Sequence, residues 1–216
     1  MKTDADLKRD VTDELAWDPS VKATAIGVSV KNGVVTLTGH IETFAEKQAA
    51  ARAVRRVADV KAIALELDVK LAPSHKRSDT DIAANAKQAL KWNAVVPVDA
   101  VRVTVDHGWV TLQGEVEWDY QRRAADKAVR CLLGVVGISN ELTLRDRAKV
   151  ADLTKRIEEA LTRQAVREAH QIQVSVEGQT ITLRGKVHSW AERDAVQGVA
   201  WSAPGVQSVV NDLQIA

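Results

Sequence analysis

The chain has 216 residues, of which 45% are hydrophobic and 27% are charged. These proportions are typical of a folded globular protein and exclude a disordered chain. The 30 Lys and Arg residues nearly balance the 29 Asp and Glu residues, in each third of the chain as well as overall. The sequence therefore argues against a nucleic-acid-binding protein, which would carry a strong positive charge.

The sequence indicates neither a membrane span nor an export signal. No run of 18 apolar residues occurs, and no apolar stretch follows Lys2, so we expect no transmembrane helix and no signal peptide. The single cysteine, Cys131, excludes an intramolecular disulfide and fits a reducing compartment. These features predict a cytoplasmic protein.

One pattern occurs three times along the chain. It is an alternating apolar segment that ends in a glycine, at Gly39, Gly114 and Gly185. These glycines are 75 and then 71 residues apart, a period that indicates domain-sized modules and not short solenoid repeats. We therefore divide the chain into three modules, at residues 1–72, 78–146 and 149–216.

Each module begins with a segment that predicts an amphipathic helix. Apolar residues recur at i, i+4 and i+8, a spacing that lines one face of a helix. They are Leu7, Val11 and Leu15 in the first module, Ile82, Ala86 and Leu90 in the second, and Leu153, Ile157 and Leu161 in the third. An acidic residue precedes each set (Asp6, Asp81, Asp152), where the helix dipole favours negative charge.

A β-hairpin is predicted next in every module, because apolar residues then alternate with polar ones on both sides of a short turn. Asn32-Gly33 suits a type I′ turn, and Gly178-Gln179 suits type II′. The closing glycines share the inward face of the returning strand, so we expect each to mark a bend or the close approach of a helix. The glycines to which we assign a structural role are Gly33, Gly39, Gly108, Gly114, Gly178 and Gly185.

An alanine-rich helix and a third strand complete each module. The order αββαβ predicts an α+β fold of three tandem sandwiches, each with a three-stranded mixed sheet and two helices on one face. The other face of the sheet is expected to stay partly open.

This pattern resembles the BON family of bacterial osmotic-stress and nodulation proteins, including its osmotically inducible members. The resemblance rests on Trp17-Asp18-Pro19-Ser20-Val21, on Ile26-x-Val28-x-Val30-x-Asn32-Gly33-x-Val35-Thr36-Leu37-x-Gly39, and on the closing Gly134-Val135-x-x-Ile138-x-Asn140-x-Leu142. It covers nearly the whole chain. Family resemblance implies non-enzymatic modules that associate with phospholipid surfaces, often in the periplasm. A relative that carries a LysM domain responds to potassium.

No catalytic or metal-binding constellation is evident in the sequence. None of the five histidines has a second ligand at metal spacing, and the paired glycines lack the helix N-terminus that would hold a phosphate. Cys131 is interpreted as a small packing residue of the second helix of its module. We therefore expect no enzyme activity, no metal, no cofactor and no small-molecule substrate.

Basic helix faces are the stronger candidates for function. The second helices of the first two modules each carry three basic residues at helical spacing, where they could meet anionic headgroups. These residues are Arg52, Arg55 and Arg56, and then Arg123, Lys127 and Arg130. The alternative is an ordinary solvated helix face balanced by nearby acidic residues.

Six tryptophans, against one Phe and one Tyr, offer possible membrane anchors. Trp92 follows Lys87 and Lys91 at a helix end, a combination that suits a bilayer interface, and Trp109 lies at a hairpin tip. Either tryptophan could instead be structural. Trp17, Trp118 and Trp201 are expected to cover small cores.

These observations lead to two hypotheses. The first is a cytoplasmic, stress-associated binding protein that contacts an anionic phospholipid membrane surface or a membrane-associated protein through basic helix faces and exposed tryptophans. The alternative is a soluble protein-interaction scaffold or a potassium-responsive protein. Family habit makes the periplasm the second choice of compartment.

Overall fold

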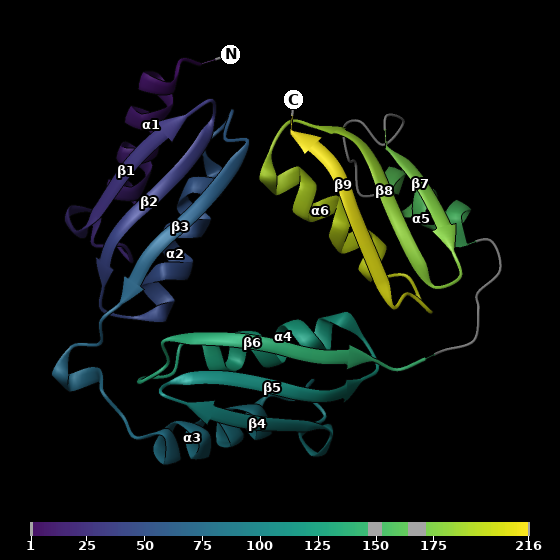
Figure 1. Ribbon diagram of the computed structural model, residues 1–216. Coiled ribbons are helices and arrows are strands. Elements are labelled where there is room, and N and C mark those ends of the chain that lie inside the picture. The colour runs from purple at the N-terminus through teal and green to yellow at the C-terminus, as the bar shows by residue number, and fades with distance from the viewer. Residues whose placement is uncertain (1, 147–152, 164–171, 216) are drawn as a thin grey trace. The chain divides into compact units, whose positions relative to one another are not determined.

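The computed structural model describes residues 2–146, 153–163 and 172–215 (Figure 1). Each module has the predicted order of helix, two strands, helix and strand. The first module contains α1 (Asp4–Trp17), β1 (Ile26–Lys31), β2 (Val34–Ile41), α2 (Phe44–Arg56) and β3 (Ala62–Val69). The second contains α3 (Asp79–Trp92), β4 (Val101–Asp106), β5 (Trp109–Val116), α4 (Asp119–Arg130) and β6 (Gly137–Leu144). The third contains α5 (Leu153–Arg163), β7 (Gln173–Glu177), β8 (Thr180–Val187), α6 (Trp190–Trp201) and β9 (Ser208–Ile215).

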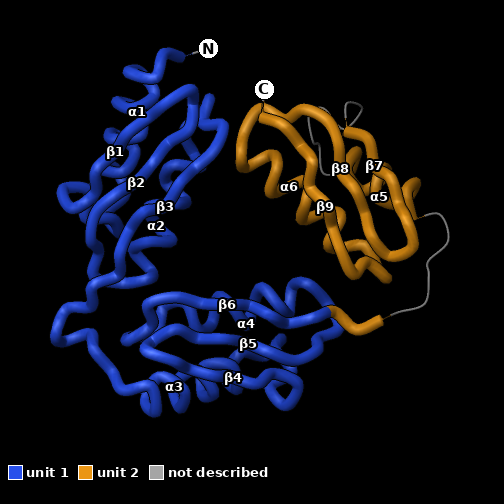
Figure 2. The backbone as a smooth tube through the Cα atoms, in the orientation of Figure 1, with its two compact units in different colours: residues 1–143 blue, residues 144–216 orange. Residues whose placement is uncertain are grey.

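In the described residues, nine strands form three separate sheets of three strands each. In the first sheet β1 pairs antiparallel with β2, and β2 pairs parallel with β3; the third sheet repeats this arrangement. The two helices of each module cover one face of its sheet (Figure 1). The predicted α+β fold with mixed sheets is therefore confirmed. By backbone contacts the chain divides into two compact units, residues 1–143 and 144–216 (Figure 2).

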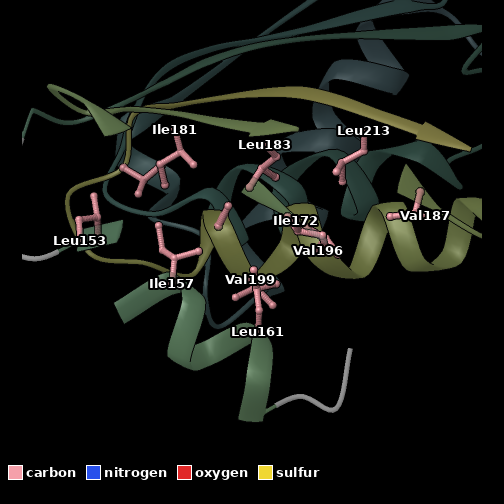
Figure 3. Close-up of a cluster of buried hydrophobic side chains, with 12 residues drawn as sticks. Leu153, Ile157, Leu161, Ile172, Ile181, Leu183, Val187, Val196, Val199 and Leu213 are labelled. Carbon is pink, nitrogen blue, oxygen red and sulfur yellow. The ribbon is translucent and has the colours of Figure 1, made fainter. Parts of the chain in front are cut away.

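The core of the third module lies between its two helices and the inner face of its sheet (Figure 3). The predicted helix residues Leu153, Ile157 and Leu161 are all buried there. Each fully buried Leu or Ile side chain contributes about 1.5–3 kcal/mol relative to an exposed one. The other members of this core are Ile172, Ile181, Leu183, Val187, Val196, Val199, Ala200, Val206 and Leu213.

The first helices of the first two modules begin with a capping arrangement that also holds the hairpin. Ser78 caps α3 by accepting from the Asp81 N–H, and Thr3 caps α1 in the same way. The carboxylate of Asp79, the first residue of α3, accepts the N–H groups of His107 and Gly108 at 2.8 and 2.9 Å. Asp4 holds the first hairpin in the same manner. The third predicted acidic residue, Asp152, lies outside the described residues.

The hairpin turns have the predicted geometry. Asn32 and Gly33 both have positive φ, as do His107 and Gly108, and type I′ turns require this at both central residues. In the turn pair of the third module, Gly178-Gln179, only Gly178 has positive φ, as type II′ requires.

The closing glycines mark a close backbone approach, but a helix is not what approaches them. Gly39 has φ +132°, and a Cβ built on it would lie 2.2 Å from the carbonyl oxygen of Ala25. At Gly114 the corresponding distance is 1.9 Å, to the carbonyl oxygen of Ala100. Both carbonyls belong to short 3-10 turns that precede the first strands. Of the two expected causes, a bend or the approach of a helix, no α-helix contact is found at Gly39 and Gly114. Glycine is needed at both because the carbonyl of the residue before its strand partner takes the place of a Cβ.

One backbone position in the first module is strained. Asp59 has φ +70°, whereas Gly134 and Gly205 occupy the equivalent positions with φ +90° and +87°. This left-handed conformation costs an aspartate about 1 kcal/mol. The Asp59 carboxylate accepts one exposed hydrogen bond, from the Lys2 N–H at 3.3 Å, which offsets little of that cost. We expect the Asp59→Gly variant to stabilise the first module by about 1 kcal/mol. Slower amide hydrogen exchange in β2 would show this, and faster exchange would contradict it.

Candidate interaction surfaces

Two tryptophans at the same position in successive modules project into solvent. Trp17 ends α1 and Trp92 ends α3, and their exposed fractions are 82% and 80%. The expectation that Trp17 covers a small core was therefore wrong, because Trp17 lies about 200° around α1 from the buried Leu15 and faces away from the core. Trp118 and Trp201 are half-buried, as expected.

The surroundings of the two exposed tryptophans differ in charge. Lys87 and Lys91 lie one turn apart on α3 and are both exposed. At the equivalent positions α1 carries uncharged residues, and its Asp13 and Glu14 lie near Trp17 around the same groove. The combination of an exposed tryptophan with nearby lysines is therefore specific to the second module.

A groove lies between the first helix and the end of the second helix of the first module, and we call this position the helix groove. Its volume is about 450 Å³. Arg56 lies in it and donates hydrogen bonds to Glu14 at 2.6 Å and to Asp18 at 2.9 Å. Acidic residues dominate the lining, which consists of Lys2, Asp10, Asp13, Glu14, Trp17, Arg56, Val57 and Ala58.

The third module has a helix groove at the same position but with opposite charge. Its volume is about 270 Å³. Arg156 replaces Asp10, and Arg163 replaces Trp17 and lies 4.0 Å from Glu159, which also lines the groove. Apolar residues form much of the remaining wall. That wall includes Ile157, Ala160, Val199, Ala203 and Pro204.

In the second module the equivalent positions are largely apolar. Cys131 stands where the first module has Arg56, and Leu132 and Leu133 follow it. Leu133 is 45% exposed and Cys131 is exposed, so the interpretation of Cys131 as a packing residue was wrong: α4 ends at Arg130. Leu133 was not predicted as a surface residue of interest. Its position is equivalent to that of Ala58, which lines the groove of the first module, and only this equivalence points to it.

Ion pairs involve several of the predicted basic residues. In the second module Arg123 contacts the buried carboxylate of Asp119 at 2.7 Å, and Arg130 pairs with Asp126. Lys127 is exposed on the same helix. In the first module Arg52 and Arg55 are exposed, while Arg56 is held in its groove. The paired arginines would have to exchange a carboxylate for a headgroup, so Lys87 and Lys91 are better placed to bind an anion.

Asp18 at the helix groove is an acid-sensitive point. Hydrogen bonds from the Ser20 side chain and from Arg56 lower its pKa from 3.8 to about 2. Because the folded pKa lies below the ordinary one, the ionised carboxylate stabilises the first module above pH 4, and this stabilisation is lost as the pH falls toward 2. We expect Asp18→Asn to remove about 1 kcal/mol of this pH-dependent stability. Urea unfolding from pH 5 to pH 2 measures it, and parallel curves for the two proteins would contradict it.

Trp109 has a different setting from Trp92. It begins β5 and lies on the face of the sheet that the helices do not cover, with its indole Nε1 donating to Ser139 Oγ at 2.9 Å. Its ring is 48% exposed. The helix groove of the second module and this sheet face are therefore separate surfaces.

Among the described residues, one group of possible metal ligands comes together, formed by Asp79, Asp106 and His107. Both Asp79 oxygens already accept backbone N–H groups of the hairpin, and the other two residues are exposed. Holding the turn accounts for this cluster. In the same described part of the chain no helix is both long and apolar enough to cross a membrane.

Comparison with known proteins places this fold in a family. The family model described as BON domain matches residues 3–70, 78–146 and 149–216. The chain is 30% identical over 145 residues to osmotically-inducible protein Y of Escherichia coli (strain K12), covering 63% of this chain and 72% of that protein.

Two solved structures of CdsD, a structural protein of the type III secretion system of Chlamydia trachomatis, also match. One covers 98% of this chain and 92% of its own, and the other, a C-terminal domain, covers 100% of both. Both are 14% identical with a TM-score of 0.27, so the likeness carries no argument. The three matched segments and the curated relative show that the chain belongs to the BON-domain family.

Proposed function

We propose that the protein is a non-enzymatic, stress-associated binding protein that attaches to anionic phospholipid surfaces. The observation that carries this proposal is the 80% exposure of Trp92 next to Lys87 and Lys91. The exposed Leu133, in the turn that follows α4, adds apolar surface in the same module. The printed name of the Escherichia coli relative, osmotically inducible, supports the association with stress.

The chemistry of these side chains suits the boundary between headgroups and acyl chains. Each lysine near an anionic surface contributes about 1 kcal/mol of attraction, and its aliphatic stem lets the ammonium group reach the phosphates. Tryptophan favours the interface because its ring is apolar and its N–H is polar. The mechanism is adhesion without turnover, and it works equally in the cytoplasm and in the periplasm.

Attachment through one small surface is weak, so a second contact matters. The helix groove of the third module carries Arg156 and Arg163 against one acidic residue, Glu159, which pairs with Arg163. Its excess of positive charge favours an anionic surface. Linking two weak sites raises the overall affinity because the second contact forms within the same molecule. The acidic helix groove of the first module is not expected to take part.

Binding to vesicles of phosphatidylcholine, with and without phosphatidylglycerol, tests the proposal. We expect the Lys87→Gln/Lys91→Gln variant to lose about 2 kcal/mol, or roughly 30-fold in affinity for the anionic vesicles. Trp92→Ala should remove the blue shift in tryptophan fluorescence that accompanies binding. High salt should weaken binding by the unsubstituted chain.

Trp17→Ala is the matched control, because Trp17 has the same helix position and the same exposure but acidic neighbours. It should bind like the unsubstituted chain. If binding is independent of phosphatidylglycerol, or if the Trp17 and Trp92 variants lose it equally, lipid attachment at α3 is wrong.

The alternative function is that of a scaffold for protein partners, or of a protein that responds to potassium. The specific observation in its favour is the uncovered outer face of each sheet (Figure 1). Compaction that depends on potassium, in a protein that does not bind vesicles, would favour this alternative.

A further inference from the structure

Trp109 lies flat on the uncovered face of the second sheet and is fixed there. A Cβ built on Gly137 of β6 would come within 2.4 Å of the six-membered ring of the indole, so the ring covers that glycine directly. The hydrogen bond from its Nε1 to Ser139 Oγ restricts rotation of the ring on the sheet. One face of the indole is therefore covered by the backbone of Gly137, a known way in which aromatic residues stabilise glycine in a strand. The residue as a whole is 48% exposed.

The rest of this sheet face is a shallow polar strip, which we call the sheet platform. Beyond Trp109 come small side chains, Thr111 on β5 and its partner Thr104 on β4. Further along, Gln113 pairs with Arg102 across the strands and donates to Glu141 Oε2 at 2.8 Å. Gln113 follows Trp109 by four residues along the strand, a distance of about 14 Å. The platform thus has an aromatic end, a low middle and an end rich in hydrogen-bonding groups.

The charge of the sheet platform opposes anionic partners. One basic residue, Arg102, is set against three acidic ones, Asp106, Glu115 and Glu141. A phosphate-bearing lipid or a nucleic acid would meet a negative surface there. An uncharged ligand with many hydroxyl groups meets donors and acceptors of both kinds.

We propose that the sheet platform binds a carbohydrate, a short chain of pyranose rings with equatorial substituents. Such a ring presents C–H groups on its flat face, and their partial positive charge suits the electron-rich face of an indole. Its hydroxyl groups project from the rim of the ring. There the Gln113 amide can donate and accept hydrogen bonds and the Glu141 carboxylate can accept them, and the bond between the two side chains holds both in place. Trp109 needs no reorganisation to stack, because both its ring plane and its N–H are already held.

The other two modules lack this surface, which makes the second module the carbohydrate-binding one. Val34 stands at the place of Trp109 in the first module, opposite Ala62. In the third module Thr180 stands there, opposite Ser208. Neither pair provides an aromatic ring.

Titration of the full chain with cellotetraose and with tetra-N-acetylchitotetraose, followed by the indole N–H resonances in NMR, tests the proposal. We expect the Trp109 resonance to shift with one of the two sugars. Trp109→Ala should weaken binding by about tenfold or more. Gln113→Ala, which leaves the aromatic ring and its glycine contact in place, should weaken it by a smaller factor.

Trp92→Ala is the matched control and should bind the sugar normally, since its ring belongs to the helix surface proposed for lipid. The sugar proposal and the lipid proposal can thus fail separately. Absence of any shift with both sugars overturns the carbohydrate site, as does sugar binding that survives both Trp109→Ala and Gln113→Ala. A Trp109 resonance that moves only with anionic vesicles would also overturn it.

Discussion

Replacing Gly114 by alanine is expected to destabilise the second module by about 3 kcal/mol. The new Cβ would lie 1.9 Å from the carbonyl oxygen of Ala100, and the backbone at φ +134° is one that side chains rarely adopt. Neither backbone can move without disturbing the pairing of β4 with β5. Amide hydrogen exchange across β5 measures the effect, because it reports the opening free energy of one module within the full chain.

Two other glycines provide matched controls. Gly178 has φ +66° but no atom within 4 Å of its added Cβ, so Gly178→Ala should cost the third module only about 1 kcal/mol. Gly198 lies within α6 with open space around it, and alanine there should stabilise the helix by about 0.5–1 kcal/mol. Equal effects at Gly114 and Gly178 would show that the close carbonyl is unimportant.

The Asp79→Ala variant is expected to lose about 2 kcal/mol in the second module. Its carboxylate accepts two N–H groups of the hairpin turn, and both donors lose their charged acceptor together. Because the interaction joins residues 28 and 29 positions apart, its loss frees the hairpin tip from the helix. Faster hydrogen exchange at His107 and Gly108 is the direct measurement.

Asp99→Ala separates this effect from a general loss of negative charge. Asp99 is exposed in the short 3-10 turn of the same module, so its replacement should change stability by less than about 0.5 kcal/mol. Asp79→Asn should fall between the two, since an amide retains one accepting oxygen. A hairpin tip that exchanges normally in Asp79→Ala would contradict the proposed role of the carboxylate.

The sequence predicts the fold of each module because its signals are local. Helix spacing at Leu7, Val11 and Leu15, strand alternation and the turn pair Asn32-Gly33 each depend on neighbouring residues, and the structure confirms all three. The contact at Gly114 is different. The repeat of the glycine predicted a structural role for it. The carbonyl that requires the glycine belongs to a turn earlier in the chain, and no pattern in the sequence identifies that partner.

The candidate surfaces were harder to predict for the same reason. Lys87, Lys91 and Trp92 are close in sequence, so their proximity could be predicted, whereas Leu133 lies in the turn after α4, distant in sequence. Trp17 was assigned to a core because aromatic residues usually gain from burial. The helical spacing contradicts that assignment, because Trp17 lies about 200° around α1 from the buried Leu15 and so faces solvent. Trp109 was seen as a hairpin tip, but its contact with Gly137 depends on the pairing of β5 with β6.

The helix groove has a consequence for how such a chain can diversify. Its variable positions, such as Asp10, Asn85 and Arg156, lie outside the buried cores, so an exchange of residues there costs the fold little. The first and third copies of one framework thus carry helix grooves of opposite net charge, and the second carries largely apolar residues at the equivalent positions. Duplication supplies spare copies of the framework, and each copy is free to acquire its own ligand preference while the others keep theirs.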